Sequence, residues 1–298
     1  MNKKLFVIPV VVILAVVIAV VVWPRGGTAV KKHDAVKDFR QGSSKSDESK
    51  SDEKSGEVQQ PVSIPAKGVY TFAAVGQEEV KLGPVPADTR IFPTEIVASV
   101  KEPAAAADGS TTTTAKADKA SGVDTGSVEK CFDYELSLLA EHIEKTTYCA
   151  SVSGKGDKAV NQLRIAAHTM QMKMGPANPV ATLTCDPELV ISEGANLSDI
   201  KCSLVLGGGP MEVNADMTGS LTVGAPEAID VGGTAVQARP VAINYVASGK
   251  VSGPWSETIW MAVDDWLPVK IVREINLRGP ANIRETSELN LKSLEPTT

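Results

Sequence analysis

The chain has 298 residues, of which 43% are hydrophobic, 4% aromatic and 22% charged, and its formal net charge at pH 7 is −6. A negatively charged chain without basic clusters interleaved with aromatic residues is unlike a nucleic-acid-binding protein, so a nucleic-acid partner is disfavoured.

The N-terminus carries the pattern of a membrane anchor. Lys3 and Lys4 lie in residues 1–4, which we expect on the cytoplasmic side, and the nineteen residues 5–23 contain no charged side chain. At about 1.5 Å per residue, a helix of this length matches the hydrocarbon core of a bilayer, so we expect a transmembrane helix whose partner is the lipid bilayer. The alternative is a cleaved signal peptide. Against it, the run exceeds the usual apolar region of about 7–15 residues and no small-residue cleavage site precedes Trp23.

Residues 24–60 are expected to form a disordered tether between this anchor and the rest of the chain. The segment Gln41–Gly56 is rich in Ser, Lys, Asp and Glu, and only scattered apolar residues surround it. Such a segment buries too little apolar surface to offset the entropy of ordering. As a coil it would span on the order of 35 Å and hold the following domain clear of the membrane.

Residues 61–298 alternate between apolar and polar side chains almost throughout, which predicts one mainly β domain. The clearest strand is 211–223. Several expected strands exceed about ten residues and keep one apolar face, which favours a large, curved antiparallel sheet over a compact sandwich. The other expected strands are 69–75, 94–100, 132–138, 147–152, 160–173, 180–185, 236–247, 256–263, 267–277 and 283–291.

Three stretches of this domain depart from the alternating pattern. Residues 136–144 and 186–197 are weak helix candidates. Residues 103–127, rich in alanine and threonine, form a low-complexity insertion that we expect to be a disordered loop.

Four cysteines lie in the same domain. They allow three pairings, of which we favour Cys131 with Cys149 and Cys185 with Cys202, because each pair is local and would bracket a single hairpin or loop. A zinc site is the alternative, and the absence of any C-x-x-C spacing disfavours it. Because disulfides form in oxidising compartments, we expect a single-pass protein of the cell membrane with residues 24–298 on the extracytoplasmic side.

Several short motifs resemble those of one protein group. The domain is similar to the extracytoplasmic domain of single-pass membrane proteins of actinobacteria, a group without an assigned activity, and the resemblance covers most of residues 61–296. One departure is Asp264-Asp265-Trp266 before Leu267-Pro268, where the group usually carries a glycine. The motifs are Pro65–Phe72, Gly76–Val80 with Leu82-Gly83, Thr184–Pro187 with the later Cys202, and Leu289–Pro296.

A second likeness concerns the fold. The strand Leu267–Ile271, which reads Leu-Pro-Val-Lys-Ile, is followed by a final long strand, as in half-barrels of the LolA and LppX type, whose curved sheets hold lipids. This likeness implies a LolA-like half-barrel with a lipid on its concave face. Fold alone does not imply function.

Catalytic motifs are missing from the sequence. It contains no G-x-S-x-G, no H-E-x-x-H and no phosphate-binding P-loop pattern. His142 lies among Glu141, Glu144 and Lys145, which predicts a solvated turn residue. We therefore expect a protein that is not an enzyme and has no cofactor.

One constellation offers a metal alternative. His168, Met170, Met172 and Met174 recur at every second residue and would line one face of a strand. Imidazole and thioether groups are soft ligands that suit copper(I). The favoured interpretation is that flexible methionines fill an irregular apolar interior.

Together these patterns predict a membrane-anchored, extracytoplasmic binding protein of the cell envelope for a hydrophobic ligand such as a lipid. The alternative is a structural or interaction protein of the envelope with a filled core and an envelope protein as its partner. The apolar faces expected to hold the ligand carry Met211, Val213, Met217, Leu221, Val269, Ile271 and Ile275.

Overall fold

The computed structural model describes residues 27–43, 62–82, 86–103, 129–154, 159–173, 178–207 and 213–298. The expected transmembrane helix at 5–23 lies outside these residues, as does nearly all of the expected loop at 103–127. Within the described ranges, no helix has the length and apolar character needed to cross a membrane.

The described chain is mainly β, as the alternating pattern predicts. Its strands are β1 (Gly68–Leu82), β2 (Asp88–Ile91), β3 (Glu95–Lys101), β4 (Lys130–Leu139), β5 (His142–Ser153), β6 (Val160–Met172), β7 (Val180–Cys185), β8 (Leu189–Ser192), β9 (Asn196–Gly207), β10 (Val213–Val223), β11 (Glu227–Val231), β12 (Thr234–Gly249), β13 (Gly253–Ala262), β14 (Pro268–Leu277) and β15 (Ala281–Leu291). The two weak helix candidates belong to strands and turns: residues 136–144 lie in β4, a turn and β5, and residues 186–197 lie in β8, in the turns beside it and at the start of β9.

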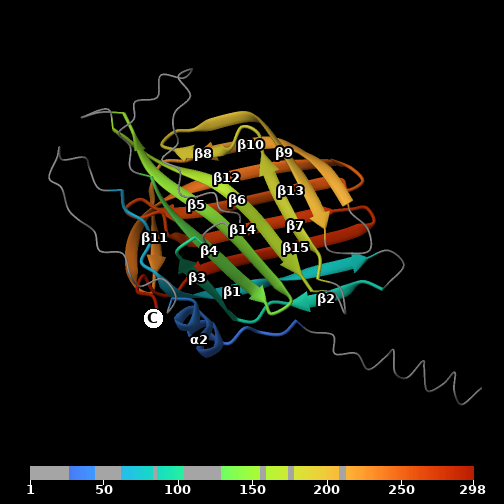
Figure 1. Ribbon diagram of the computed structural model, residues 1–298, viewed down its shortest axis with the longest axis horizontal. Coiled ribbons are helices and arrows are strands. Elements are labelled where there is room, and N and C mark those ends of the chain that lie inside the picture. Colours follow the sequence, from blue (N-terminus) through green and yellow to red (C-terminus); the bar gives the residue numbers. More distant parts are fainter. Residues whose placement is uncertain are drawn as a thin grey trace, which may run out of the picture.

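The strands form one closed antiparallel barrel (Figure 1). Twelve of them follow the order β10-β9-β7-β6-β5-β4-β3-β1-β15-β14-β13-β12, while β2, β8 and β11 pair outside this path with β1, β6 and β12. The barrel closes because β10 pairs with β12, with Ala215–Val223 opposite Val241–Gly249. At this seam Gly219 is required, since a Cβ there would collide with the carbonyl oxygen of Asn244.

The expected half-barrel is therefore wrong in its finer detail. An open curved sheet leaves two edges and a concave face to be covered, whereas pairing between β10 and β12 removes both edges. The inward side chains of the closed barrel form a continuous apolar cluster that includes Phe72, Leu163, Met217 and Leu289.

Both expected disulfides are confirmed. Cys131 bonds to Cys149 between β4 and β5, and Cys185 bonds to Cys202 between β7 and β9. In each case the two cysteines are direct cross-strand partners. The described residues contain no free cysteine, so no thiol is left for the zinc alternative.

A helix, α2 (Lys32–Ser43), lies in the segment expected to be a disordered tether. Its buried side chains Val36 and Phe39 pack against Val69 and Val97 on the outer faces of β1 and β3. Figure 1 shows α2 beside these strands and close to the C-terminus. Disorder is therefore wrong for this stretch, because a docking site on the barrel supplies the apolar contacts that the isolated segment lacks.

Candidate ligand cavity and buried ion network

The barrel interior holds a set of buried ionisable side chains. Strand register places them in two rows: Glu257, Arg273 and Ser287 are successive cross-strand partners on β13, β14 and β15. Arg90 and Glu285 lie opposite Glu78 on the two sides of β1. Because cross-strand partners point to the same face of a sheet, both rows face the interior. Their members can therefore meet side chains from the opposite wall.

Arg273 is the centre of the first row. It is 4% exposed and donates to both carboxylate oxygens of Glu144 on β5, at 2.5 and 2.7 Å. It also donates twice to Glu257 Oε1, at 3.0 and 2.6 Å, and once to Glu285 Oε1, at 3.4 Å. These bonds use all three nitrogen atoms of the guanidinium group, and each of them donates to at least one glutamate side chain.

His142 joins the two rows across the barrel. Its Nδ1 lies 2.5 Å from Glu78 Oε2, and its Nε2 lies 3.2 Å from Glu144 Oε1 in an ion pair whose geometry is too bent for a hydrogen bond. Burial disfavours the charged imidazole, but the contacts with Glu144 and Glu78 outweigh burial and raise the pKa of His142 to about 10. The predicted solvated turn residue is therefore wrong, because the His142 side chain is completely buried.

Arg90 extends the network towards the surface. It donates to Glu78 Oε1 at 3.1 Å and to Asp88 Oδ2 at 2.8 Å, and the Asp88 side chain is about half exposed. A third bond, of 3.2 Å, goes to the backbone carbonyl oxygen of Lys173. A chain of ion pairs thus runs from the outside of the barrel at β2 to Arg273 in its interior.

Glu285 differs from the other carboxylates of the network. Burial raises its pKa above the ordinary glutamate value even though Arg273 lies beside it. By contrast, burial also opposes ionisation of Glu144, but Arg273 and His142 hold the pKa of Glu144 well below the usual range. Burial thus disfavours the ionised form of Glu285, whereas the other three carboxyl groups, Glu78, Glu144 and Glu257, form ion pairs with an equal number of cationic partners, Arg90, His142 and Arg273.

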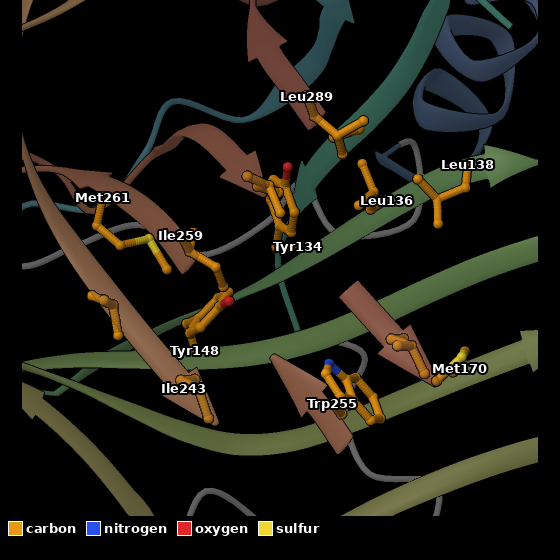
Figure 2. Packing of buried hydrophobic residues seen from close by; sticks show 14 of the residues in the cluster. Tyr134, Leu136, Leu138, Tyr148, Met170, Ile243, Trp255, Ile259, Met261 and Leu289 are labelled. Atoms are coloured by element: carbon orange, nitrogen blue, oxygen red, sulfur yellow. The ribbon is translucent and has the colours of Figure 1, made fainter. Parts of the chain in front are cut away.

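A cavity of about 200 Å³ lies against this network. Its polar end contains Glu144, Glu257 and Arg273. Four aromatic side chains form part of its wall, of which Figure 2 shows Tyr134, Tyr148 and Trp255 near Ile243 and Ile259. The remaining apolar wall includes Leu136, Ile165, Leu183, Leu189, Ile271 and Tyr245, the fourth aromatic residue.

The cavity reaches the surface where β6, β7 and β8 meet. Its lining there includes the exposed residues Ala167, Thr184 and Glu188. At this point β6 changes partner, pairing with β8 through residues 162–165 and with β7 through residues 168–171. The change of partner leaves a break in the wall of the barrel, and this break is the mouth of the cavity.

Three polar atoms on the cavity wall are buried without a hydrogen-bond partner: Tyr134 Oη, His168 Nε2 and Trp255 Nε1. Trp255 packs edge-on against Tyr245 and His168, with ring centroids 6.2 and 6.3 Å away. His168 Nδ1 lies 2.9 Å from Thr146 Oγ1, and burial lowers the pKa of His168, which keeps the imidazole neutral at pH 7. Buried polar groups seldom lack partners, so the three atoms mark a place for a bound molecule or for water.

The structure separates the residues that sequence analysis assigns to the ligand. Ile271 lines the 200 Å³ cavity, and Val213 lines a smaller cavity of about 30 Å³. Met211 lies outside the described residues. The other four, Met217, Leu221, Val269 and Ile275, are packed in the apolar cluster.

The candidate copper ligands are also divided. His168 lines the larger cavity, whereas Met170 and Met172 line the smaller one among apolar side chains, and Met174 is outside the described residues. All three described side chains face inward, in keeping with the filling role of the methionines.

Two groups of described residues bring possible metal-ligand atoms together, of which Glu129 with Cys131 and Cys149 consists of a carboxylate beside a disulfide bond. Atoms of Glu78, His142 and Glu285 lie within 4.8 Å of one another. However, Glu78 already pairs with His142 and Arg90, and Glu285 is within reach of Arg273. Two guanidinium groups beside the carboxylates supply the positive charge that a metal ion would bring, so the cluster fits an ion network better than a cation site.

Most of the site is invisible to sequence reasoning for one reason. On β5 the inward positions 142, 144, 146 and 148 carry His, Glu, Thr and Tyr, whereas the outward position 143 carries isoleucine. The outward positions 145 and 147 carry Lys and Thr, so polar residues occupy both faces of this strand and no apolar face marks the buried side. Because apolar and polar residues do not alternate here, the sequence indicates a strand only from residue 147 onwards and does not reveal the buried face that carries His142 and Glu144.

Comparisons of this chain with models of protein families, with curated proteins and with solved structures found no match.

Proposed function

We propose that this protein is a membrane-anchored, extracytoplasmic binding protein of the cell envelope that holds a small hydrophobic ligand inside its barrel. The observation that carries this proposal is the 200 Å³ cavity, with its aromatic and aliphatic wall, its smaller number of polar and charged side chains and its opening to the surface. Binding sites for small molecules share this combination of a mostly apolar wall and a few placed polar groups.

The size of the cavity limits the ligand. Pockets for drug-sized molecules measure about 300–1,000 Å³, and a dry cavity of about 150 Å³ is large enough for benzene. At about 200 Å³, this cavity accepts a substituted aromatic ring or a short acyl segment. A lipid would therefore place only part of one chain inside the barrel.

Two features support the location. The disulfides Cys131–Cys149 and Cys185–Cys202 favour an oxidising compartment. The uncharged run at residues 5–23 supplies a candidate anchor for the same chain. Both are consistent with a barrel outside the cytoplasm.

Native mass spectrometry of the full-length chain, purified from its own host, tests the proposal. We expect a co-purifying hydrophobic molecule of low mass. The matched variants are Leu183→Trp, which adds volume at a half-buried position on the cavity wall, and Leu206→Trp, which makes the same change where only the smaller cavity is lined. Leu183→Trp should lose the bound molecule and Leu206→Trp should keep it. A wild-type chain without any bound molecule would contradict the proposal.

The alternative of an interaction protein rests on a different observation. Val75 and Ile91 are 77% and 72% exposed on the neighbouring strands β1 and β2. Exposed apolar side chains of this size suit a contact with an envelope protein. Replacing both with threonine should weaken such a contact and leave cavity binding unchanged.

A further inference from the structure

We infer that the ligand carries an uncharged hydroxyl group, bound between His168 and Trp255, on an otherwise apolar body. This inference rests on the proposed function, because it names the chemical class of the molecule held in the same cavity. It starts from His168 Nε2 and Trp255 Nε1, two polar atoms buried without partners, which belong to neighbouring rings of the cavity wall.

The hydrogen-bonding capacity of these two atoms selects the head group. The indole nitrogen of Trp255 can only donate. The Nε2 atom of His168 donates or accepts according to the tautomer, because Nδ1 faces Thr146 Oγ1, which can itself do either. A hydroxyl group accepts from the indole and either donates to or accepts from the imidazole. It therefore satisfies both nitrogen atoms whichever tautomer is present.

The rings also lie at a suitable separation. Their centroids are 6.3 Å apart in an edge-on arrangement, so both nitrogen atoms belong to one short stretch of wall. Both rings contact the apolar part of the cavity, where Tyr245 and Ile243 are neighbours of Trp255 in the lining. A ligand can thus place one oxygen atom at the rings and an apolar body against the aliphatic wall.

Charge excludes an anionic head group. Among the described residues that line the cavity, Arg273 is the only cationic side chain, and its donor nitrogens are all committed to Glu144, Glu257 and Glu285. A carboxylate would enter an apolar cavity without a free cation to pair with it, at a high cost in desolvation. Displacing one of the present carboxylates from Arg273 would leave that carboxylate buried and unpaired instead.

A cationic head group is disfavoured for the complementary reason. Glu144 uses both of its oxygen atoms on Arg273, and Glu257 Oε1 accepts two bonds from the same guanidinium. An ammonium group at this end of the cavity would lie beside Arg273 without a carboxylate of its own. The neutral hydroxyl is the head group that needs no change in the ion network.

A matched set of small molecules tests this inference. The full-length chain, labelled with 5-fluorotryptophan and held in lipid nanodiscs, is titrated with p-cresol, p-xylene and 4-methylbenzoate while the ¹⁹F signal of Trp255 is followed. That signal is assigned by its loss in Trp255→Phe. The molecules share a methylated ring and differ in one substituent, and their partition into empty nanodiscs is measured for correction. We expect p-cresol to bind about tenfold more tightly than p-xylene, and 4-methylbenzoate to bind most weakly.

Two variants test whether His168 causes the preference for p-cresol over p-xylene. His168→Phe keeps a flat ring and removes both nitrogen atoms, so it should bring the affinity for p-cresol down to that for p-xylene. Tyr70→Phe is the control, because it removes a hydroxyl that bonds to the Ala66 carbonyl oxygen and is not part of the cavity lining. It should keep the wild-type preference.

The outcomes separate this inference from the proposed function. Equal affinities for p-cresol and p-xylene in the wild-type chain would overturn the hydroxyl while leaving the apolar cavity as a binding site. Tightest binding of 4-methylbenzoate would overturn the neutral head group. If none of the three molecules shifts the Trp255 signal, the hydroxyl site beside Trp255 is overturned, and the proposed function is then decided by the native mass spectrometry of the wild-type chain. The wild-type comparison alone is decisive should His168→Phe fail to fold.

Discussion

The two sides of the barrel interior are built on different principles. The wall formed by β9, β10 and β12 is apolar, and its inward side chains Met217, Leu221 and Val241 are completely buried. The ion network around His142 and Arg273 is carried by β5 on one side of the interior and by β1, β14 and β15 facing it, and the inward charged side chains of these strands are together called the polar wall. On the apolar wall each buried side chain contributes about 1.5–3 kcal/mol, largely independently of its neighbours. On the polar wall a charged group is tolerated only with its partners present.

The cavity lies where these two walls meet. Ile243 on β12 belongs to the apolar side of its lining, while Glu144 and Arg273 belong to the polar side. Because each wall supplies its own kind of side chain, a cavity between them has apolar side chains on one side and charged side chains on the other. The comparison therefore predicts that changes on the polar wall propagate through shared partners, whereas changes on the apolar wall remain local.

The largest effect is expected from Arg273→Met. This change removes the cationic partner of the buried Glu144 and of the largely buried Glu257, so we expect the free energy of unfolding to fall by about 3–5 kcal/mol in urea titrations. The matched control is Arg284→Met, because the Arg284 side chain is 57% exposed and lies 3.9 Å from Glu79. The control should change stability by about 0.5 kcal/mol or less. Similar losses for the two variants would remove the distinction between network and surface pairs.

On the apolar wall, Met217→Ala tests local packing. Removing this completely buried side chain should lower the free energy of unfolding by about 2–5 kcal/mol, with the cost set by the cavity that remains. The double variant Met217→Ala with Ile243→Val removes side-chain volume at two places on the same wall. Its loss of unfolding free energy should equal the sum of the two single losses within about 0.5 kcal/mol if the two sites relax independently. Strong non-additivity would show that the apolar wall also behaves as a connected unit.

The pH dependence of the free energy of unfolding also distinguishes the two walls, with a smaller effect for each pH unit. The pKa of His142 is raised from 6.5 to about 10 in the folded state. Its contribution is therefore complete below pH 6.5 and is lost as the pH rises towards 10, by about 1.4 kcal/mol for each pH unit. Imidazole proton resonances in an NMR titration should show His142 protonated well above pH 8 and His168 already neutral at pH 7. A His142 resonance that titrates near pH 6.5 would contradict the network.

The same comparison explains what sequence reasoning can reach. On β10 and β14 the apolar residues face inward, so the strands and their buried faces follow from alternation. Closure of the barrel does not follow from the sequence, because the pairing between β10 and β12 has no signature in the apolar–polar pattern. The cysteine pairs follow from their local spacing. The helix α2 escapes notice because Val36 and Phe39 are its only large buried side chains, and their binding surface at Val69 and Val97 lies in other parts of the chain.

The smallest effect is expected within the network itself, from Glu285→Gln. Burial raises the pKa of Glu285 and so disfavours its ionised form, and an uncharged amide of the same shape removes that cost while the three ion pairs of Glu78, Glu144 and Glu257 with Arg90, His142 and Arg273 stay in place. We expect a change of about 1 kcal/mol or less at pH 7. The matched variant Glu144→Gln removes a charge that Arg273 and His142 stabilise, and it should cost about 3 kcal/mol. The difference between the two losses of unfolding free energy should narrow as the pH falls. Glu144 is then protonated in the unfolded state while it is still ionised in the folded state, and this lowers the stability that its charge contributes. Equal losses for the two variants at pH 7 would mean that Glu285 is ionised, and that the polar wall carries an uncompensated negative charge.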